Sequence, residues 1–377
     1  MKNTTTKFLT RARIVFCALL QGTSLFAATI TATEGAVLDG LSPFNWVRTG
    51  NAISTAVNGA SVSLKFQGTR QVALRVATEH MASKVPARFP IIAWSVNGSP
   101  PQSRQLAANE TSALLCSNIE NPAIELYVKG MSPFENRYTG DVPANAIKIT
   151  GFTVDDGGSV AAATLPSKIW LNIGDSIMSG DGAAYAEKQG RPPNDEWAAS
   201  EDGRASYGYL LARHYGYRES RIAYGGYNWG GGMAGVPALS TLIDQVTSTQ
   251  SRLTGNALNP PPQVVLINLG ENGAPADKAV IQALEKVRSR VSPQTKIIVV
   301  VPVSGRARTE VSRAFNSYKS AAKDESAYLV DLGKVTFATC DGQHPTAAGH
   351  QMIFAAAMAL LDAVVGKAEK PDGKVAP

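Results

Sequence analysis

The residues best suited to chemistry lie in four short segments in the second half of the chain. These segments are Gly174-Asp175-Ser176-Ile177, Gly225-Gly226-Tyr227-Asn228-Trp229, Gly270-Glu271-Asn272-Gly273 and Asp341-Gly342-Gln343-His344-Pro345. Serine, asparagine and histidine supply the donors and acceptors of acyl transfer, and glycine lets backbone N–H groups approach a ligand. If the fold brings the segments together, they predict one site for acyl-transfer chemistry.

The sequence from Lys168 to residue 365 has the pattern that would bring them together. Apolar β-type runs alternate there with longer helical patterns, which is typical of βαβ units around a parallel sheet. We expect strands at residues 169–173, 221–224, 264–269, 296–303 and 328–332, and helices near 207–214, 239–252, 278–291, 310–322 and 346–365. Ligands of open α/β sheets bind beyond the carboxyl ends of the strands, and the four segments fall on that rim.

The first half of the chain has a different pattern. Residues 28–156 contain short alternating runs, among them 62–66, 72–76 and 124–128, separated by Gly, Asn and Pro turns. Such runs predict a β-sandwich or jelly-roll domain. The small residues of segment 157–167 indicate a linker, and the polar segment 366–377 indicates a disordered tail.

The four segments resemble the pattern of the SGNH (GDSL-like) hydrolase superfamily, which is GDS, a glycine loop, GxND and DxxH in this order. A lone Gly-Asp-Ser is weak evidence, whereas four blocks in order, each after a predicted strand, are specific. The resemblance covers roughly residues 166 to 365. It implies a three-layer αβα domain of the flavodoxin-like kind, so the expected fold class is α/β, with the β-sandwich domain in front.

The resemblance also implies catalytic roles. Ser176 would attack an ester carbonyl, and His344 would take its proton and later pass one to the departing alcohol. Asp341 would hold the imidazole in its productive tautomer. Asp175 would be a structural hydrogen-bonding group of the turn. The alternative for Ser176 is helix N-capping, a common role of serine after such a turn.

The implied oxyanion hole consists of the N–H groups of Ser176 and Gly226 and the side-chain amide of Asn272. Gly225 is the alternative to Gly226. One departure from the family pattern is Gly273, which stands where Asp usually follows the asparagine. The amide of Asn272 is present, so the missing aspartate affects only how the loop that carries this amide is held in place.

The chain has four histidines, and only His344 has an aspartate three residues before it and Pro345 after it. His80 lies in the β-rich half, and His350 lies in the last predicted helix. His214 lies near the end of a predicted helix, where its interaction with the helix dipole is sufficient to explain a histidine. Pro345 lets the loop end where a helix begins. His344 is therefore the predicted base.

Two aromatic residues of the second segment, Tyr227 and Trp229, are candidates for substrate binding. The long polar segment 179–204 follows the first segment and is a candidate lid or binding loop. Core packing of Trp229 and ordinary surface structure for the segment are equally compatible with the sequence.

The amino terminus has the features of a secretory signal peptide. Residues 1–27 carry four basic residues and no acidic one, followed by a short apolar run and small residues near Ala27. Their removal lowers the formal net charge from +6 to +2. We therefore expect a secreted or periplasmic protein with no integral membrane segment after processing. No basic block interleaved with aromatics suggests nucleic-acid binding.

Export would permit a disulfide between Cys116 and Cys340, while two buried free thiols are equally compatible with the sequence. Neither cysteine has zinc-ligand spacing, so we expect no metal and no cofactor. The sequence does not indicate an oligomeric state.

The segments Ile124-Glu-Leu-Tyr-Val-Lys129 and Gly151-Phe-Thr-Val-Asp155 look similar to family-two carbohydrate esterases, in which a jelly roll precedes the SGNH domain. Gly130-Met131 replace their usual arginine-containing continuation. We expect an exported serine esterase that removes a small acyl group, with acetyl favoured, from a carbohydrate. The alternatives are an acyltransferase with the same site and a noncatalytic carbohydrate-binding protein.

Overall fold

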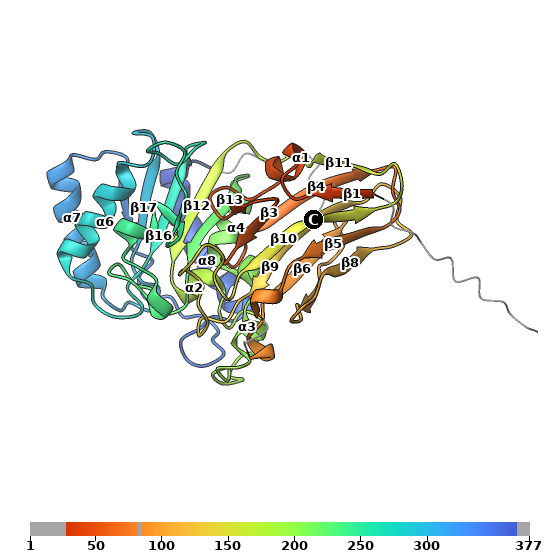
Figure 1. Cartoon of the computed structure of the whole chain (residues 1–377). Helices are drawn as coiled ribbons and strands as arrows, with labels where there is room; N and C mark the ends of the chain where they lie inside the picture. The colour runs from red at the N-terminus through yellow and green to blue at the C-terminus, as the bar shows by residue number, and fades with distance from the viewer. Residues whose placement is uncertain (1–27, 82–84, 368–377) are drawn as a thin grey trace, which may run out of the picture.

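A computed structural model of the protein describes residues 28–81 and 85–367. An antiparallel β-sandwich comes first in the chain, and a domain with a parallel sheet follows it (Figure 1). This arrangement confirms the expected α/β fold class and the β-sandwich in front of it. The predicted signal peptide lies outside the described residues, as does segment 368–377 of the predicted tail.

The first sheet of the sandwich has six strands in the order β2-β3-β10-β5-β8, and β1 also pairs with β10. Every pairing is antiparallel. The short helix α1 (Gly35–Asp39) follows the first strand. The strands are β1 (Ala28–Thr31), β2 (Val47–Thr49), β3 (Ala52–Thr55), β5 (Val72–Val76), β8 (Ser112–Cys116) and β10 (Ile147–Val154).

The facing sheet has five strands in the order β11-β4-β9-β6-β7. They are β4 (Ser61–Gln67), β6 (Ile91–Val96), β7 (Gln102–Gln105), β9 (Ala123–Gly130) and β11 (Ser159–Ala162). Strand β11 corrects the prediction of a linker at 157–167, because it pairs with β4 at the edge of this sheet. An edge strand pairs through its backbone, so small side chains do not prevent it.

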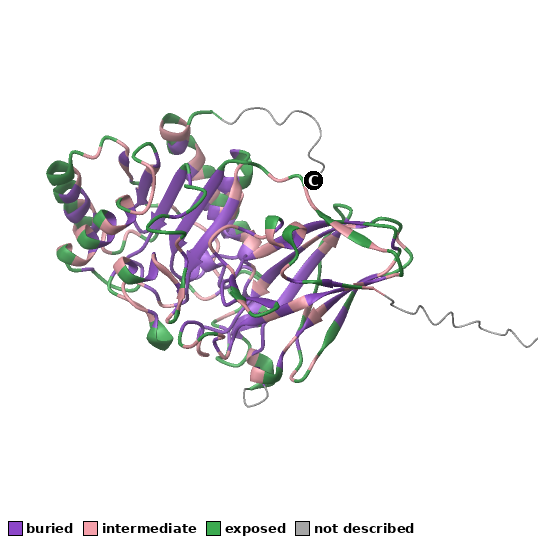
Figure 2. Cartoon of the chain, turned by 45° about the horizontal axis from the view of Figure 1, so that its top comes forward, coloured by how far each residue is buried: buried purple, intermediate pink, exposed green. Residues whose placement is uncertain are grey.

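The alternation of the predicted strands has the expected physical cause. In β4, Val62, Leu64 and Phe66 are at most 2% exposed and form part of the core between the two sheets. The intervening Lys65 points outward. Successive side chains of a strand point to opposite faces, and one set of them enters the core. Figure 2 shows many buried residues along the strands of the sandwich.

The second domain contains a five-stranded parallel sheet in the order β13-β12-β16-β17-β18. Its strands are β12 (Ile169–Gly174), β13 (Arg218–Ala223), β16 (Val264–Asn268), β17 (Lys296–Val300) and β18 (Ala327–Val330). This is the 2-1-3-4-5 strand order of the flavodoxin-like fold. The strand order reverses at β12, which places its carboxyl end at the crevice where such sheets bind ligands.

Helices cover both faces of the parallel sheet. Helices α4 (Tyr207–His214) and α8 (Ala347–Val365) pack on one face, and α5 (Leu239–Leu242), α6 (Asp277–Arg288) and α7 (Arg308–Ala322) pack on the other. In β16, Val264 and Leu266 face the first set, while Val265 and Ile267 face the second. Burial on both faces explains why these strands read as continuous apolar runs. Two further short helices are α2 (Ser176–Ser179) and α3 (Trp197–Ser200).

The helix predicted at 239–252 is largely wrong. Helix α5 ends at Leu242, and a small hairpin of β14 (Gln245–Thr247) and β15 (Gln250–Ser251) follows it. The hairpin sequence is rich in β-branched Val and Thr and in serine, residues that are neutral to unfavourable inside helices. The N–H of Thr249 donates to the Thr247 hydroxyl across the turn.

Among the described residues, only helix α8 is long and apolar enough, by length and composition, to cross a membrane. Its residues His350, Ile353, Ala357 and Leu361 are buried. The helix packs against α4 and β18 as one layer of the second domain. Packing against the sheet thus accounts for part of its apolar character.

The two cysteines that would remain after processing are free thiols. Cys116 ends β8 of the sandwich, and Cys340 precedes the fourth chemical segment in the second domain. Both are buried. The structure thus favours the second of the two alternatives left open by the sequence.

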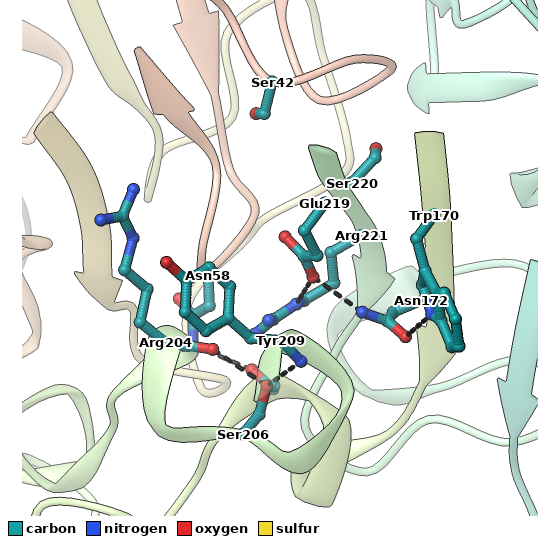
Figure 3. A network of polar contacts seen from close by, with 12 residues as sticks. Ser42, Asn58, Trp170, Asn172, Arg204, Ser206, Tyr209, Glu219, Ser220 and Arg221 are labelled. Atoms are coloured by element: carbon teal, nitrogen blue, oxygen red, sulfur yellow. Dashed lines mark hydrogen bonds and ion pairs between the residues drawn. The ribbon is translucent and has the colours of Figure 1, made fainter. Parts of the chain in front are cut away.

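Buried polar groups lie in the second domain where it meets the sandwich. Glu219 Oε1 accepts hydrogen bonds from Arg221 Nε at 2.9 Å and from Asn172 Nδ2 at 3.0 Å (Figure 3). From the sandwich, Asn45 Nδ2 donates to the carbonyl of Arg221. The side chain of Arg221 is fully buried and that of Glu219 is 5% exposed. Buried charges are costly unless paired, so the Arg221–Glu219 pair stabilises this face of the second domain, and Asn45 attaches the sandwich to it.

We predict that Arg221→Ala destabilises the protein by about 3 to 5 kcal/mol, because it leaves Glu219 buried without its cation. Urea unfolding at neutral pH measures this change. Arg313→Ala is the control, since Arg313 pairs with Asp277 on an exposed surface and its loss should have little effect. Equal destabilisation by the two variants would contradict the role of the junction pair.

Candidate active site

The four chemical segments meet at one edge of the parallel sheet. Ser176 follows β12, Gly226 follows β13, Asn272 follows β16, and Asp341 and His344 lie in the loop before α8. All five line one cavity of about 260 Å³. The parallel strands end at the same edge, so the loops that follow them converge there.

Ser176 is the first residue of α2, and the preceding Asp175 caps that helix. Asp175 Oδ1 accepts a hydrogen bond from the N–H of Ile177 at 3.0 Å. The aspartate therefore holds the turn, as expected, and the serine side chain is not needed as a cap. Ser176 is 3% exposed and opens on the cavity.

His344 and Asp341 form a hydrogen-bonded pair. The ring Nδ1 of His344 lies 2.8 Å from Asp341 Oδ2, and Asp341 Oδ1 accepts from the backbone N–H groups of Gln343 and His344. Burial by itself raises the pKa of Asp341, but these hydrogen bonds outweigh it and hold the pKa well below its usual range. The ionised carboxylate thus fixes the ring and leaves Nε2 for chemistry.

Backbone N–H groups at the cavity are free to bind an anion, and that of Gly225, the alternative to Gly226, is among them. In the described part of the chain, the N–H groups of Ser176 and Gly226 have no hydrogen-bond acceptor. Gly226 has a φ of 68°, and a Cβ there would lie 2.6 Å from the side chain of Met233, so glycine is required. Such donors stabilise a developing oxyanion.

The side-chain amide of Asn272 also faces the cavity. Its Nδ2 donates to the carbonyl of Tyr227 at 2.9 Å, which orients the amide and leaves its second N–H available. Asn228 Nδ2 donates to the carbonyl of Gly273 at 3.0 Å. The neighbouring Glu271 accepts from the N–H of Ser304. These contacts brace the loop in which Gly273 stands for the usual aspartate.

Tyr227 and Trp229 do not line the cavity, so the prediction that they bind substrate is wrong. Both side chains are fully buried. The indole N–H of Trp229 donates to the carbonyl of Leu269 at 3.1 Å, and the Tyr227 ring packs on Tyr224. Their segment turns inward after Gly226, and large aromatic groups are stabilised by burial in the core.

The other histidines are engaged elsewhere. His80 Nε2 contacts the carbonyl of Ala146 in the sandwich, and His214 is exposed on α4. His350 is fully buried, and burial lowers its pKa to about 3. In the described residues, His344 is the one histidine that lines this cavity.

Sequence reasoning missed several residues that complete the cavity. Trp197 comes from segment 179–204, and its ring meets the His344 ring edge to face, with centroids 5.4 Å apart. Phe134 of the sandwich domain packs on Trp197, and Arg191 lies over the same indole. Asp181 accepts a hydrogen bond from Trp197 Nε1 at 2.9 Å. The length of the segment was the available signal, but it did not indicate which residue turns inward.

Comparison with known families gives one match. Residues 171–357 match the model of the GDSL-like lipase/acylhydrolase family. The second domain belongs to this family. The match spans β12 to α8 and includes every residue of the predicted triad and oxyanion hole. No curated protein was found that matches the chain in sequence.

Solved structures with the same two-domain fold are similar to the whole chain. A family two carbohydrate esterase from Cellvibrio japonicus has a TM-score of 0.75 and 16% identity, covering 91% of this chain and 99% of its own. An acetyl xylan esterase from Butyrivibrio proteoclasticus has a TM-score of 0.71 and 17% identity, with coverage of 91% and 99%. A family two carbohydrate esterase from Clostridium thermocellum, in complex with cellohexaose, has a TM-score of 0.66 and 20% identity, with coverage of 86% and 98%. At these identities the likeness shows the fold.

We predict that Asp341→Asn removes a pH-dependent contribution to stability. The folded pKa of Asp341 is lowered, so its contribution is present above the unfolded value of about 3.9 and is lost as the pH falls below it. The wild type should therefore lose more free energy of unfolding than the variant between neutral and acidic pH. Urea titrations at several pH values measure the difference.

The control is Asp156→Asn, which makes the same change of charge in an exposed turn of the sandwich. Its stability should follow the wild-type pH dependence. If Asp341→Asn also follows the wild-type curve, the pair with His344 does not stabilise the fold.

Proposed function

We propose that the protein is a serine esterase that uses Ser176, His344 and Asp341 as a catalytic triad. The observation that carries the proposal is that Ser176, the fixed imidazole and two free N–H groups line the same cavity. A neutral serine hydroxyl is a weak nucleophile and needs such a base. An acylhydrolase family match supports the same reaction class.

The reaction proceeds in two steps. Ser176 Oγ bonds to the carbonyl carbon of the ester while His344 takes the hydroxyl proton. The oxyanion collapses, the C–O bond to the alcohol breaks, and His344 returns the proton to the departing oxygen. Water then attacks the acyl-enzyme with His344 as base, which releases the carboxylic acid and restores the serine.

Three donors would hold the oxyanion: the N–H groups of Ser176 and Gly226 and the amide of Asn272. Removing one such donor typically lowers kcat by roughly a hundredfold to a thousandfold. The contact between Asn272 Nδ2 and the carbonyl of Tyr227 supports this role, because it holds the amide in place before substrate arrives. Preorganised donors need no rearrangement as charge develops.

A carbohydrate that carries a small acyl group, acetyl in the first place, is the proposed substrate. The similar structures include an acetyl xylan esterase and a carbohydrate esterase bound to cellohexaose. The cavity of about 260 Å³ lies below the range of roughly 300 to 1,000 Å³ for drug-sized ligands. Its lining includes the polar groups Asp181, Arg191 and Gln343, which are poor partners for a long acyl chain.

The basic amino terminus with its short apolar run supports export, so we also propose a secreted or periplasmic location. A carbohydrate substrate outside the cytoplasm is compatible with this location. Appearance of the mature chain in the periplasm or medium, with Ala28 or Thr29 as first residue, tests it.

We predict that a fluorophosphonate probe labels the wild type at Ser176 and does not label Ser176→Ala. The phosphonate mimics the ester carbonyl and traps the activated oxygen. Ser179→Ala is a matched control, because Ser179 lies in the same helix but does not line the cavity. Mass spectrometry locates the adduct. Labelling at another serine, or full esterase activity of Ser176→Ala, would refute the nucleophile assignment.

We also predict that kcat/KM falls from acetyl to butyryl esters and is very small for octanoyl. Each methylene that found an apolar surface would add about 0.8 kcal/mol of binding, but the cavity offers little such surface. Phe134, Trp197 and Met233 are its large apolar lining residues. A para-nitrophenyl ester series, followed by acetylated oligosaccharides, measures the preference.

A maximum at octanoyl or longer would mean that these three side chains open into an apolar groove, and it would refute the deacetylase assignment. Transfer of the acyl group to an added alcohol in preference to water would favour the acyltransferase alternative. Binding of oligosaccharide without any turnover would favour the noncatalytic alternative.

A further inference from the structure

The carboxyl groups of Asp181 and Glu201 are buried near His344, the proposed catalytic base. Asp181 is five residues after Ser176, and its N–H donates to the carbonyl of Ser176 at 3.0 Å. Glu201 directly follows helix α3, which carries Trp197. Both acidic side chains are fully buried, and only Asp181 lines the cavity.

In each carboxyl group, one of the two oxygens accepts hydrogen bonds from protein donors. Asp181 Oδ2 accepts from the indole N–H of Trp197 at 2.9 Å. Glu201 Oε2 accepts from the N–H of Met131 at 2.6 Å and from the amide of Asn58, both in the sandwich domain. The other two oxygens, Asp181 Oδ1 and Glu201 Oε1, are buried and accept no hydrogen bond from any described residue.

Backbone hydrogen bonds place Asp181 and Glu201 side by side: the N–H of Asp202 donates to the carbonyl of Gly180 at 3.0 Å, and the N–H of Ala184 donates to the carbonyl of Ser200 at 2.9 Å. The two carboxyl groups interact with each other at this position. Two neighbouring carboxylates cannot both be ionised without strong repulsion, whereas a single proton between them satisfies both oxygens. We propose that Asp181 and Glu201 share one proton and that the resulting pair positions Trp197 against His344.

The charged surroundings favour one proton on the pair rather than two or none. The guanidinium of Arg137 is buried beside both acids, Lys129 Nζ donates to the carbonyl of Glu201, and His344 acts on Asp181 from the cavity side. Asp175 and Cys340 are the other titratable groups that interact with Asp181. With one shared proton, the pair keeps one negative charge, which the buried guanidinium of Arg137 attracts.

The directions of the pKa shifts agree with a proton bound to the Asp181–Glu201 pair. Burial raises the pKa of Glu201, and the neighbouring charge of Asp181 raises it further. Burial also raises the pKa of Asp181, against the effect of His344. A raised folded pKa means that the pair stabilises the fold at lower pH and loses this stabilisation as the pH rises through that pKa.

The pair connects the sandwich domain to the proposed catalytic base. Met131 and Asn58 hold Glu201, Glu201 holds Asp181 through the proton, and Asp181 holds the indole that contacts the His344 ring. The end of β9 packs closely against α3, since a Cβ on Gly130 would lie 2.1 Å from the carbonyl of Ala198. Asp181 and Glu201 are therefore positioning residues.

The direct test is infrared difference spectroscopy of wild type against Glu201→Gln at neutral pH. The glutamine amide can donate to Asp181 Oδ1 while its oxygen accepts from Met131, so the contacts survive. If the pair shares a proton, the substitution removes the band of a protonated carboxylic acid and leaves the carboxylate bands unchanged. Loss of carboxylate bands instead would overturn the proposal.

The matched control is Glu125→Gln. Glu125 lies at the same junction, on the sandwich side, where Arg204 of the second domain pairs with it. Burial raises its pKa, but the charge of Arg204 outweighs burial and lowers it overall. This variant should therefore lose carboxylate bands, which shows that the measurement separates the two protonation states. Neither spectrum depends on esterase activity, so this result stands even if the proposed function fails.

The kinetic test rests on the proposed esterase function. Glu201→Gln should keep most of the wild-type kcat, whereas Glu201→Ala should lower it by roughly tenfold to a hundredfold through misplacement of Trp197 and His344. At high pH the wild type should lose activity as the shared proton dissociates, and Glu201→Gln should resist that loss. Equal kcat values and pH profiles for Glu201→Ala and the wild type would refute the positioning role.

Discussion

The parallel pairing of β12 with both β13 and β16 is the constraint on which the site depends. Strands in a parallel sheet end at the same edge, and the order of the strands reverses at β12. The loops that follow these three strands must therefore meet at one crevice. Ser176, Gly226 and Asn272 come together because each follows one of these strands, and α8 then places its preceding loop, with His344, on the same rim.

The sandwich domain completes this site from the other side. Its Phe134 packs on Trp197, and its Met131 and Asn58 bind Glu201. Polar contacts also cross the junction: Arg204 pairs with Glu125 of the sandwich, and Asn45 Nδ2 donates to the carbonyl of Arg221, so these groups restrict how the two domains meet. The sandwich domain thus contributes Phe134 to the wall of the cavity.

Some polar groups at the site orient catalytic side chains or loops, while others have no partner in the part of the chain that the structure describes. Asp341 orients His344, Asn228 braces the loop of Asn272, and Asp175 holds the turn of Ser176. The N–H groups of Ser176 and Gly226 have no acceptor in the described residues. A buried donor without an acceptor is costly in a folded protein, which is the reason that such groups mark places where a ligand's negative charge is accommodated.

The sequence by itself determined the fold class, most strands and helices, and the residues that follow the strands, because hydrophobic periodicity and strand-end loops are local properties. It failed at β11, at the hairpin after α5 and at Tyr227 and Trp229, where pairing and burial depend on distant parts of the chain. Only the tertiary structure showed that Trp197 contacts the ring of His344 and that Asp181 and Glu201 lie beside Trp197. Their segment has no periodic pattern, and the direction of each side chain is decided by contacts with the sandwich domain, which lie far away in sequence.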